Sequence, residues 1–336
     1  MSIVKFADKF GIASIGNQTE ITTPDSPRAP EPAAGYVFNK ATLEPVLLYL
    51  AAPCGDALYL TGPTGSGKTS LIHNIAAHLG WGLQSLTVGS RTEAADLIGR
   101  PAIHDGRIVF EYGALVNAMK NGDILLINEI DMMAPGELAA LNDVLEGRPL
   151  TVTQHEGEVI RPAPSFRVIA TANSKGDGEG YAGARLLNVA FMDRFRVVEM
   201  DYPSAKVEEA IIHRAVPNLK DANLVKQALQ LATELRRVYM SADSSTDLAA
   251  PFSTRTLVRL CTLLSQGMVP QTAVDLAYAS RLQQTERDYV HRLTSDVFGN
   301  GPAPEPAPET EPATADDTGE AKPRRRTRRT KQTVSV

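Results

Sequence analysis

The sequence has few cysteines and no long apolar run. Its 336 residues include only Cys54 and Cys261, which lie far apart, and this favours reduced thiols over a disulfide scaffold. No apolar stretch approaches the roughly 20 residues that cross a bilayer, and the first ten residues have no signal-peptide core. His73 and His78 are five apart, so a helix would not place them together as metal ligands. We therefore expect a cytoplasmic protein without membrane contact.

Acidic residues outnumber basic residues in most of the chain. The net charge is −5, but the segment from Gly301 onward holds six acidic and seven basic residues, so residues 1–300 carry −6. A body of that sign is not suited to coating nucleic acid. The arginine cluster within 322–331 is typical of a solubilising or loosely electrostatic terminus. Nucleic-acid contact is expected only through this basic tail.

A glycine-rich loop follows the short apolar stretch 57–60. Residues 62–69 read "GPTGSGKT" and match the pattern GxxxxGK[ST] of a P-loop. Its glycines allow backbone N–H groups to face nucleotide phosphates, Lys68 can reach the β- and γ-phosphates, and the Thr69 hydroxyl can ligate Mg²⁺. The following residues have apolar positions at helical spacing. The predicted phosphate-binding residues are Gly62, Pro63, Thr64, Gly65, Ser66, Gly67, Lys68 and Thr69.

Strands and helices alternate along the next part of the chain, which predicts an α/β fold with a parallel sheet covered by helices. The predicted strands are 57–61, 83–88, 123–127, 166–171 and 196–200. The predicted helices are 41–51, 68–79, 113–120, 135–146, 184–192 and 204–214. Two segments, 102–110 and 150–160, alternate in polarity around turn residues and predict inserted hairpins.

Composition divides the chain into four parts. Residues 1–35 are polar and proline-dotted, which predicts a flexible arm. Residues 36–215 form the predicted α/β nucleotide-binding domain, and 216–298 carry a helical pattern typical of a small all-α lid domain. Residues 299–336 combine a Pro-Ala-Glu repeat with the arginine cluster and cannot bury enough apolar surface to order themselves.

A second nucleotide motif lies about 60 residues after the P-loop. The apolar strand 124–127 leads into Asn128 and Glu129. A carboxylate at the carboxyl end of a strand faces the γ-phosphate site, so we predict that Glu129 orients the attacking water. Asn128 takes the position of the Mg²⁺-associated acid. Its neutral amide should hold the metal shell less tightly than a carboxylate, unless Asp131 or a water network supplies the missing charge.

Three further side chains complete the predicted site. Asn173 follows the apolar strand 166–171 and can hydrogen-bond the γ-phosphate or the water, as a sensor 1 residue does. Arg194 ends a predicted helix and is a candidate finger that reaches a neighbouring subunit's γ-phosphate. Arg255 opens a helix in the lid domain and is a candidate sensor there.

Taken in order, "GPTGSGKT", "LLINEID", "IATAN", "AFMDRF" and "FSTRTL" resemble an AAA+ ATPase. The two hairpins are similar to those of the MoxR-like branch. Within it, "YVFNKATLEPVL", "VLEGRPLTV" and "YAGARLLNVAFMDRF" most resemble the ATPase subunit of aerobic cobaltochelatase, the CobS type. The resemblance covers roughly residues 9 to 298. It implies a homohexameric ring with ATP and Mg²⁺ at the subunit interfaces, and a partner that carries a von Willebrand factor A domain.

The chain departs from the family in three places. Asn128 replaces an aspartate, Ala184 and Arg185 stand where relatives tend to carry polar residues, and the tail is arginine-rich. The last two departures weaken an assignment to cobalt insertion itself. Remodelling of a protein partner is the leading hypothesis. One alternative is a nucleic-acid motor, against which the acidic body and the few basic hairpin residues argue. Another is a nucleotide-gated scaffold with little turnover, which Asn128 favours and Glu129 opposes.

Overall fold

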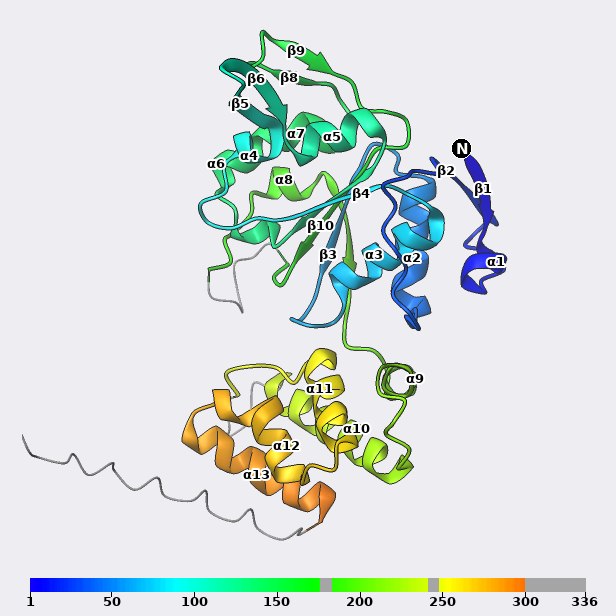
Figure 1. The fold of residues 1–336 in the computed structure, drawn as a ribbon, viewed down its shortest axis with the longest axis vertical. Coiled ribbons are helices and arrows are strands. Elements are labelled where there is room, and N and C mark those ends of the chain that lie inside the picture. The colour runs from blue at the N-terminus through cyan, green and yellow to red at the C-terminus, as the bar shows by residue number, and fades with distance from the viewer. Residues whose placement is uncertain (176–182, 241–247, 300–336) are drawn as a thin grey trace, which may run out of the picture. The chain divides into compact units, whose positions relative to one another are not determined.

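A computed structural model provides the structure, and it describes residues 1–175, 183–240 and 248–299 (Figure 1). The described residues belong to one compact unit by their own contacts. The predicted arginine-rich tail lies outside the described residues from position 300 onward. Within the described parts of the chain, no helix is both long and apolar enough to cross a membrane.

The centre of the fold is a five-stranded parallel sheet with the strand order β11-β3-β10-β7-β4. Side chains of β7 show the two-residue period, because Ile124 and Leu126 pack into one core cluster and Leu125 and Ile127 into the other. The sheet confirms the predicted fold class. Its strands are β3 (Ala57–Thr61), β4 (Leu83–Thr87), β7 (Ile124–Asn128), β10 (Arg167–Ala172) and β11 (Phe195–Glu199).

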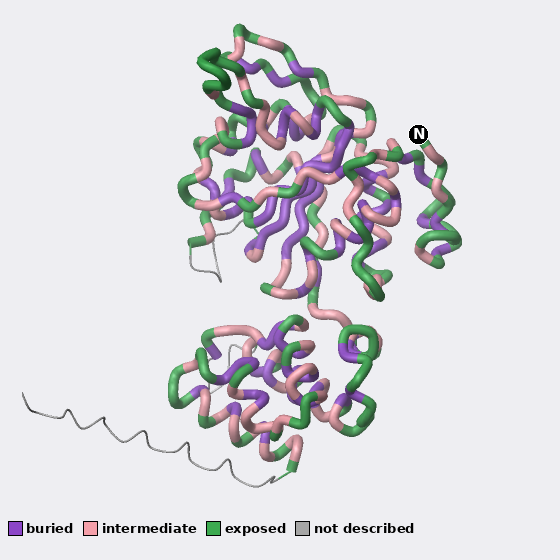
Figure 2. Tube along the Cα trace, in the orientation of Figure 1, coloured by how far each residue is buried: buried purple, intermediate pink, exposed green. Residues whose placement is uncertain are grey.

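Helices cover both faces of this sheet, and Figure 2 shows its inner strands as buried. One face packs against α2 (Lys40–Ala51) and α3 (Lys68–Leu79). The other packs against a set of shorter helices. These are α4 (Ala94–Ile98), α5 (Ala114–Asn121), α6 (Pro135–Leu138), α7 (Asn142–Leu145) and α8 (Val189–Met192).

Two predicted helices differ from the structure, one by an interruption and one by a later start. The predicted helix 135–146 contains the 3₁₀ turns η2 (Ala139–Leu141) between α6 and α7. Leu138, Leu141 and Val144, three of its buried residues, lie three positions apart, the period of a 3₁₀ helix, and Leu145 is buried beside them. The predicted helix 184–192 begins only at Val189, because the side chain of Asn188 caps it.

Both predicted hairpins are present, and they lie side by side at one end of the α/β part (Figure 1). The first pairs β5 (Gly99–His104) with β6 (Arg107–Tyr112), and the second pairs β8 (Leu150–Val152) with β9 (Glu158–Ile160). The rings of Phe110 and His155 stack between them, with centroids 4.8 Å apart. The Tyr112 hydroxyl donates to Glu158, so the two insertions support each other.

The helical region after β11 has its own core, formed around Leu231, Leu257 and Val274. We call α10 to α13 the helical domain. Its amphipathic helices bury one face each, as the periodicity predicted. The elements after β11 are α9 (Ala205–Ala215), α10 (Ala222–Met240), α11 (Thr254–Ser265), α12 (Pro270–Ala277), the 3₁₀ turn η3 (Ala279–Arg281) and α13 (Gln284–Phe298).

The prediction that residues 1–35 form a flexible arm is wrong. β1 (Ser2–Lys5) pairs with β2 (Glu20–Thr23), and α1 (Phe6–Phe10) lies between them. Apolar side chains from this segment join the core that covers α2 and α3: Phe6, Ile12, Ile15 and Ile21.

The proline-rich stretch that follows is also fixed to the fold. The Arg28 guanidinium donates twice to the buried carboxylate of Asp123, at 2.8 and 3.0 Å, and Ala33 N–H donates to Asn74. Proline content predicted a linker, but these long-range polar contacts hold the chain against the domain.

Candidate functional site

The P-loop connects β3 to α3 and has the backbone that its glycines predicted. Gly62, Gly65 and Gly67 have φ angles of 147°, 74° and 98°, a region that only glycine enters readily. A Cβ on Gly62 would come within 1.9 Å of the Met200 carbonyl oxygen. The Ser66 hydroxyl oxygen is buried and has no hydrogen-bond partner. A cradle with a spare polar atom fits a phosphate ligand.

Lys68 lies at the start of α3 and is 8% exposed. Its ammonium donates to the carbonyl oxygens of Gly62 and Pro63 and, at 3.0 Å, to Oδ1 of Asn173. Burial lowers the pKa of Lys68 to about 8, against the opposing effect of the Asp131 and Glu129 charges. Lys68 and the predicted sensor residue Asn173 therefore meet at the carboxyl edge of the sheet.

Asn128 ends β7 and is held on both sides of its amide. Its Oδ1 accepts from the hydroxyls of Thr69, at 2.7 Å, and Thr171, at 3.3 Å. Its Nδ2 donates to Ser85 and to the Leu86 carbonyl oxygen, at 3.2 and 3.1 Å. The oxygens of Thr69 and Asn128 thus converge at one point, an oxygen pair suited to a hydrated Mg²⁺.

Metal binding at this point would depend on few protein ligands. Across the described ranges, no group of three or more His, Cys, Asp or Glu side chains is arranged to hold a metal ion. Mg²⁺ commonly keeps several waters and takes the remaining oxygens from one or two side chains and the phosphates of its substrate. Thr69 and Asn128 fit that pattern.

Glu129 and Asp131 follow β7 but have different surroundings. Glu129 is exposed and adopts φ 60° and ψ 41°, a left-handed conformation unusual for glutamate. Asp131 is 2% exposed, and its Oδ2 accepts from both the backbone N–H and the hydroxyl of Ser174. Asp131 therefore anchors the residue after Asn173, whereas Glu129 presents a carboxylate to solvent at the same edge.

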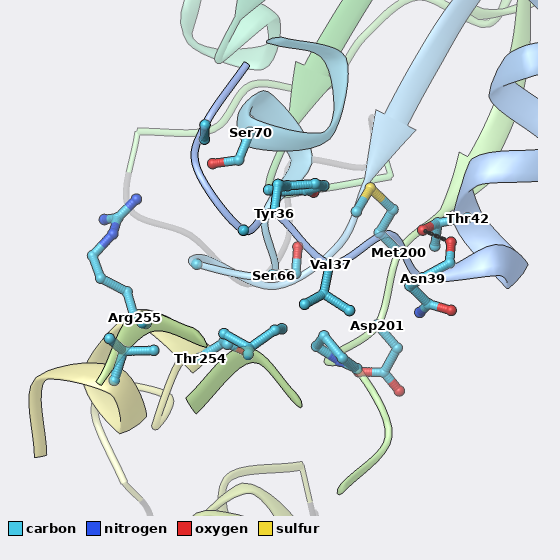
Figure 3. Close-up of a pocket in the computed structure, with 18 of the residues that line it drawn as sticks. Tyr36, Val37, Asn39, Thr42, Ser66, Ser70, Met200, Asp201, Thr254 and Arg255 are labelled. Atoms are coloured by element: carbon cyan, nitrogen blue, oxygen red, sulfur yellow. Dashed lines mark hydrogen bonds between the residues drawn. The ribbon is translucent and has the colours of Figure 1, made fainter. Parts of the chain in front are cut away.

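A cavity of about 400 Å³ adjoins the P-loop on the side of the helical domain. Its walls come from the segment before α2, from the loop after β11 and from α11 (Figure 3). The lining combines apolar side chains with hydroxyl and amide groups, as pockets for small organic ligands do. Residues 33–37 and 65–67 are among those that line it, together with Met200, Asp201, Thr254 and Arg255.

The two candidate arginines lie at different places. Arg255 lines the cavity beside the P-loop. Arg194 precedes β11, and its carbonyl oxygen accepts from Ala57 N–H, which places it at the amino edge of the sheet. A five-residue strand separates the two edges by roughly 16 Å. The Arg194 guanidinium donates to Glu146 at 2.6 Å. The structure thus brings Arg255 to the P-loop, but not Arg194.

The sequence interpretation missed the wall of the cavity that faces α11. Tyr36 is partly buried, and burial raises its pKa to about 12. Its ring meets that of Phe38 edge-on, with centroids 4.9 Å apart. The aromatic pair just before the predicted helix 41–51 was the available signal, but the sequence interpretation placed it in the nucleotide-binding domain 36–215 without a role at the site.

A P-loop on this sheet order, with an attached helical domain and polar side chains at the strand ends, defines a P-loop ATPase of the AAA+ class. The comparisons agree. Residues 57–195 match the AAA domain of the dynein-related subfamily, and residues 208–295 match the CbbQ/NirQ/NorQ C-terminal family.

Two relatives are similar to this chain over about two thirds of its length. An uncharacterized protein of Staphylococcus epidermidis is 32% identical over 233 residues, which is 68% of this chain and 86% of the relative. One of Staphylococcus haemolyticus is 31% identical over 242 residues, 69% of this chain and 89% of the relative. A crystal structure from Cytophaga hutchinsonii is similar to this chain with a TM-score of 0.45 at 16% identity. The match covers 78% of this chain and 89% of the other chain, and the family assignment does not depend on it. The chain belongs to the AAA+ ATPases of the MoxR/CbbQ type.

Proposed function

We propose that this protein hydrolyses ATP in an oligomeric ring and uses the energy to remodel a protein partner. The observation that carries the proposal is the cluster at the carboxyl edge of the sheet, where Lys68, Asn128 and Asn173 meet around the P-loop. Each comes from a different element, so the site depends on the fold rather than on one local motif.

The residues of this cluster divide the chemistry among them. Backbone N–H groups of the P-loop and the protonated Lys68 ammonium bind and orient the phosphates. Mg²⁺, held through Thr69 and Asn128, would neutralise the charge that develops on the phosphate oxygens. Glu129 orients the attacking water and accepts its proton, and the Asn173 amide, which already reaches Lys68, contacts the γ-phosphate or that water.

The position of Arg194 supports a ring. This arginine lies at the sheet edge opposite the P-loop of its own chain, so a role at the γ-phosphate requires a second copy. A hexamer is the ring that the sequence resemblance implies. The cytoplasm is the proposed compartment, because the chain has only two widely separated cysteines.

The nature of the partner is the finer part of the proposal. The resemblance to the cobaltochelatase ATPase subunit supports a protein with a von Willebrand factor A domain. In that version the ring would drive insertion of a metal ion into a tetrapyrrole bound to a different subunit. The C-terminal match to the CbbQ/NirQ/NorQ family supports the broader version, in which the client is a protein of another kind.

A mixing experiment tests the proposal. Glu129→Gln and Arg194→Ala should each bind ATP like the wild type and hydrolyse it about 100-fold more slowly or worse. Mixed together, they should recover part of the activity, because some interfaces then combine an intact Glu129 with an intact Arg194. Arg196→Ala is the matched control, since Arg196 lies two residues away and pairs with Asp56. It should hydrolyse ATP like the wild type.

Three outcomes contradict parts of the proposal. A wild type without ATPase activity would remove hydrolysis as the function. A mixture no more active than either variant, with subunit exchange verified, would remove the trans role of Arg194. Stimulation by DNA or RNA, with none by a candidate protein partner, would favour the nucleic-acid motor.

A further inference from the structure

The P-loop tip is tied to a tyrosine outside the sequence motifs. Tyr202 lies between β11 and α9, and its hydroxyl donates to the Thr64 carbonyl oxygen at 2.9 Å. Thr64 is in the part of the loop that approaches the phosphates of a nucleotide. The orientation of this peptide therefore depends on a residue 138 positions away.

The ring of Tyr202 contacts a guanidinium of the helical domain. The Arg236 Cζ atom lies 4.1 Å from the ring centroid, a cation–π distance. The same guanidinium donates from Nε to the Phe252 carbonyl oxygen at 2.7 Å. Because a guanidinium is planar and rigid, these contacts fix the ring of Tyr202 relative to the segment that begins α11.

Glu208 completes the orientation of Arg236. Both carboxylate oxygens of Glu208 accept from Arg236, each at 2.8 Å, in a bidentate pair. Glu208 is 2% exposed, so water does not compete for this pair. Its Oε1 also accepts from the Thr254 hydroxyl at 2.6 Å. Thr254 is the first residue of α11 and directly precedes Arg255.

A second contact joins the same two segments directly. A Cβ on Gly65 would come within 2.5 Å of the Ser253 Cβ, so the P-loop and the cap of α11 are already in close contact. Thr64 is thus joined to Thr254 through a chain of polar contacts, and Gly65 is joined to Ser253 by direct packing. Both paths end beside Arg255, which lines the cavity next to the P-loop.

We propose that Tyr202, Arg236 and Glu208 form a relay that couples nucleotide binding at the P-loop to the position of Arg255. They act as positioning residues, since the contacts that join them to the site run through Thr64 and through Thr254, the neighbour of Arg255. The inference rests on the proposed function, because it needs ATP at the P-loop. Coupling is reciprocal, so a ligand that engages Arg255 stabilises the P-loop conformation to the same extent as the P-loop ligand stabilises Arg255.

A double-mutant cycle tests the relay. Thr254→Val removes the hydroxyl that Glu208 accepts from, and Arg255→Ala removes the proposed end point. Each single variant should lower kcat at saturating ATP by roughly tenfold, within the range of typical coupling. The double variant should be no slower than Arg255→Ala alone, because the relay acts through Arg255. Thr262→Val is the control: the Thr262 hydroxyl lies on the same helix but donates to Val258, so kcat should not change.

A second readout separates positioning from simple stabilisation. In the wild type, a non-hydrolysable ATP analogue should increase hydrogen-exchange protection of both the P-loop and α11. Tyr202→Phe keeps the ring beside Arg236 but removes the hydroxyl bond to Thr64. In this variant the P-loop should keep its protection and α11 should lose most of the gain.

The results distinguish the relay from the proposed function. Additive effects of Thr254→Val and Arg255→Ala, or unchanged α11 protection in Tyr202→Phe, would overturn the relay and leave the ATPase proposal intact. Failure of the wild type to bind ATP in calorimetry would overturn both.

Discussion

The two sides of the P-loop are built differently. On the sheet side, Lys68 contacts Asn173, which follows β10, and Thr69 contacts Asn128, which ends the adjacent strand β7. On the side of the helical domain, the loop contacts Tyr202 and Ser253, and a buried ion pair stands behind them. Strand order alone brings the first set together. The second depends on side chains distant in sequence that meet only after the helical domain packs.

The largest expected effect concerns the side of the P-loop that faces the helical domain, and it is an effect on stability. Glu208→Ala should lower the free energy of unfolding by about 3–5 kcal/mol, because it leaves the largely buried guanidinium of Arg236 without its carboxylate partner. The control is Glu234→Ala, which removes an exposed pair with Arg237 on the same helix as Arg236. It should cost less than about 1 kcal/mol. Chemical denaturation measures the free energy of unfolding of both variants. Equal losses would mean that the Glu208–Arg236 pair contributes no more to stability than an exposed ion pair.

A smaller effect is expected on the sheet side, at Asn128. Asn128→Asp places a carboxylate oxygen next to the Leu86 carbonyl oxygen, where Nδ2 now donates. We expect a loss of about 1–3 kcal/mol in the free energy of unfolding and a lower ATPase rate, although the new charge faces the metal position. Asn173→Asp is the matched variant, because Asn173 accepts from the Lys68 ammonium and its added charge should not destabilise the fold.

A Mg²⁺ titration of the ATPase accompanies that measurement. Asn128→Asp could lower the Mg²⁺ concentration for half-maximal ATPase while its maximal rate and its free energy of unfolding equal those of the wild type. That result would mean that the hydrogen bonds of the Asn128 amide are not the reason why an asparagine stands at this position.

The smallest effect is the pH dependence of ATP binding. With a pKa of about 8, Lys68 in the free protein loses its charge as the pH rises through 8, and ATP affinity should fall by about fivefold between pH 8 and 9. Lys68→Arg should give a flat profile, because a guanidinium keeps its proton in this range. Equal slopes for the two proteins in a binding titration would exclude Lys68 as the titrating group.

The lowered pKa of Lys68 also affects folding stability, which should rise with pH where the affinity for ATP falls. The unfolded chain holds this proton up to the ordinary pKa of 10.5, so between pH 8 and 10.5 it binds more protons than the folded protein. The contribution of Lys68 to stability therefore rises with pH over that window.

The same contrast explains what the sequence could predict. The P-loop, the positions of Asn128 and Asn173 and the strands before them follow from local patterns, because the carboxyl ends of parallel strands share one edge. The arginine that opens α11 was also assigned correctly to a helix start, and it lines the cavity. The roles of these residues stay predictions.

Other features depend on pairs that no local pattern records. The carboxylate of Asp123 accepts from Arg28, 95 positions earlier, and that contact turns a predicted linker into part of the domain. Glu208 and Arg236 each read as ordinary charges on amphipathic helices, where most charges face solvent. Only the packing of α9 against α10 shows that they are buried together.

The docked N-terminal segment has a spectroscopic consequence. The chain contains a single tryptophan, Trp81, which is 1% exposed and donates its indole N–H to Gly122. Trp81 lines a cavity of about 570 Å³ together with residues 17–24, and the Arg167 guanidinium lies 5.5 Å from its ring. Its tryptophan fluorescence therefore comes from one known place, at the junction between the first residues and the sheet. Detachment of those residues would expose the indole to water and shift its emission to the red, so the protein carries its own optical marker for that event.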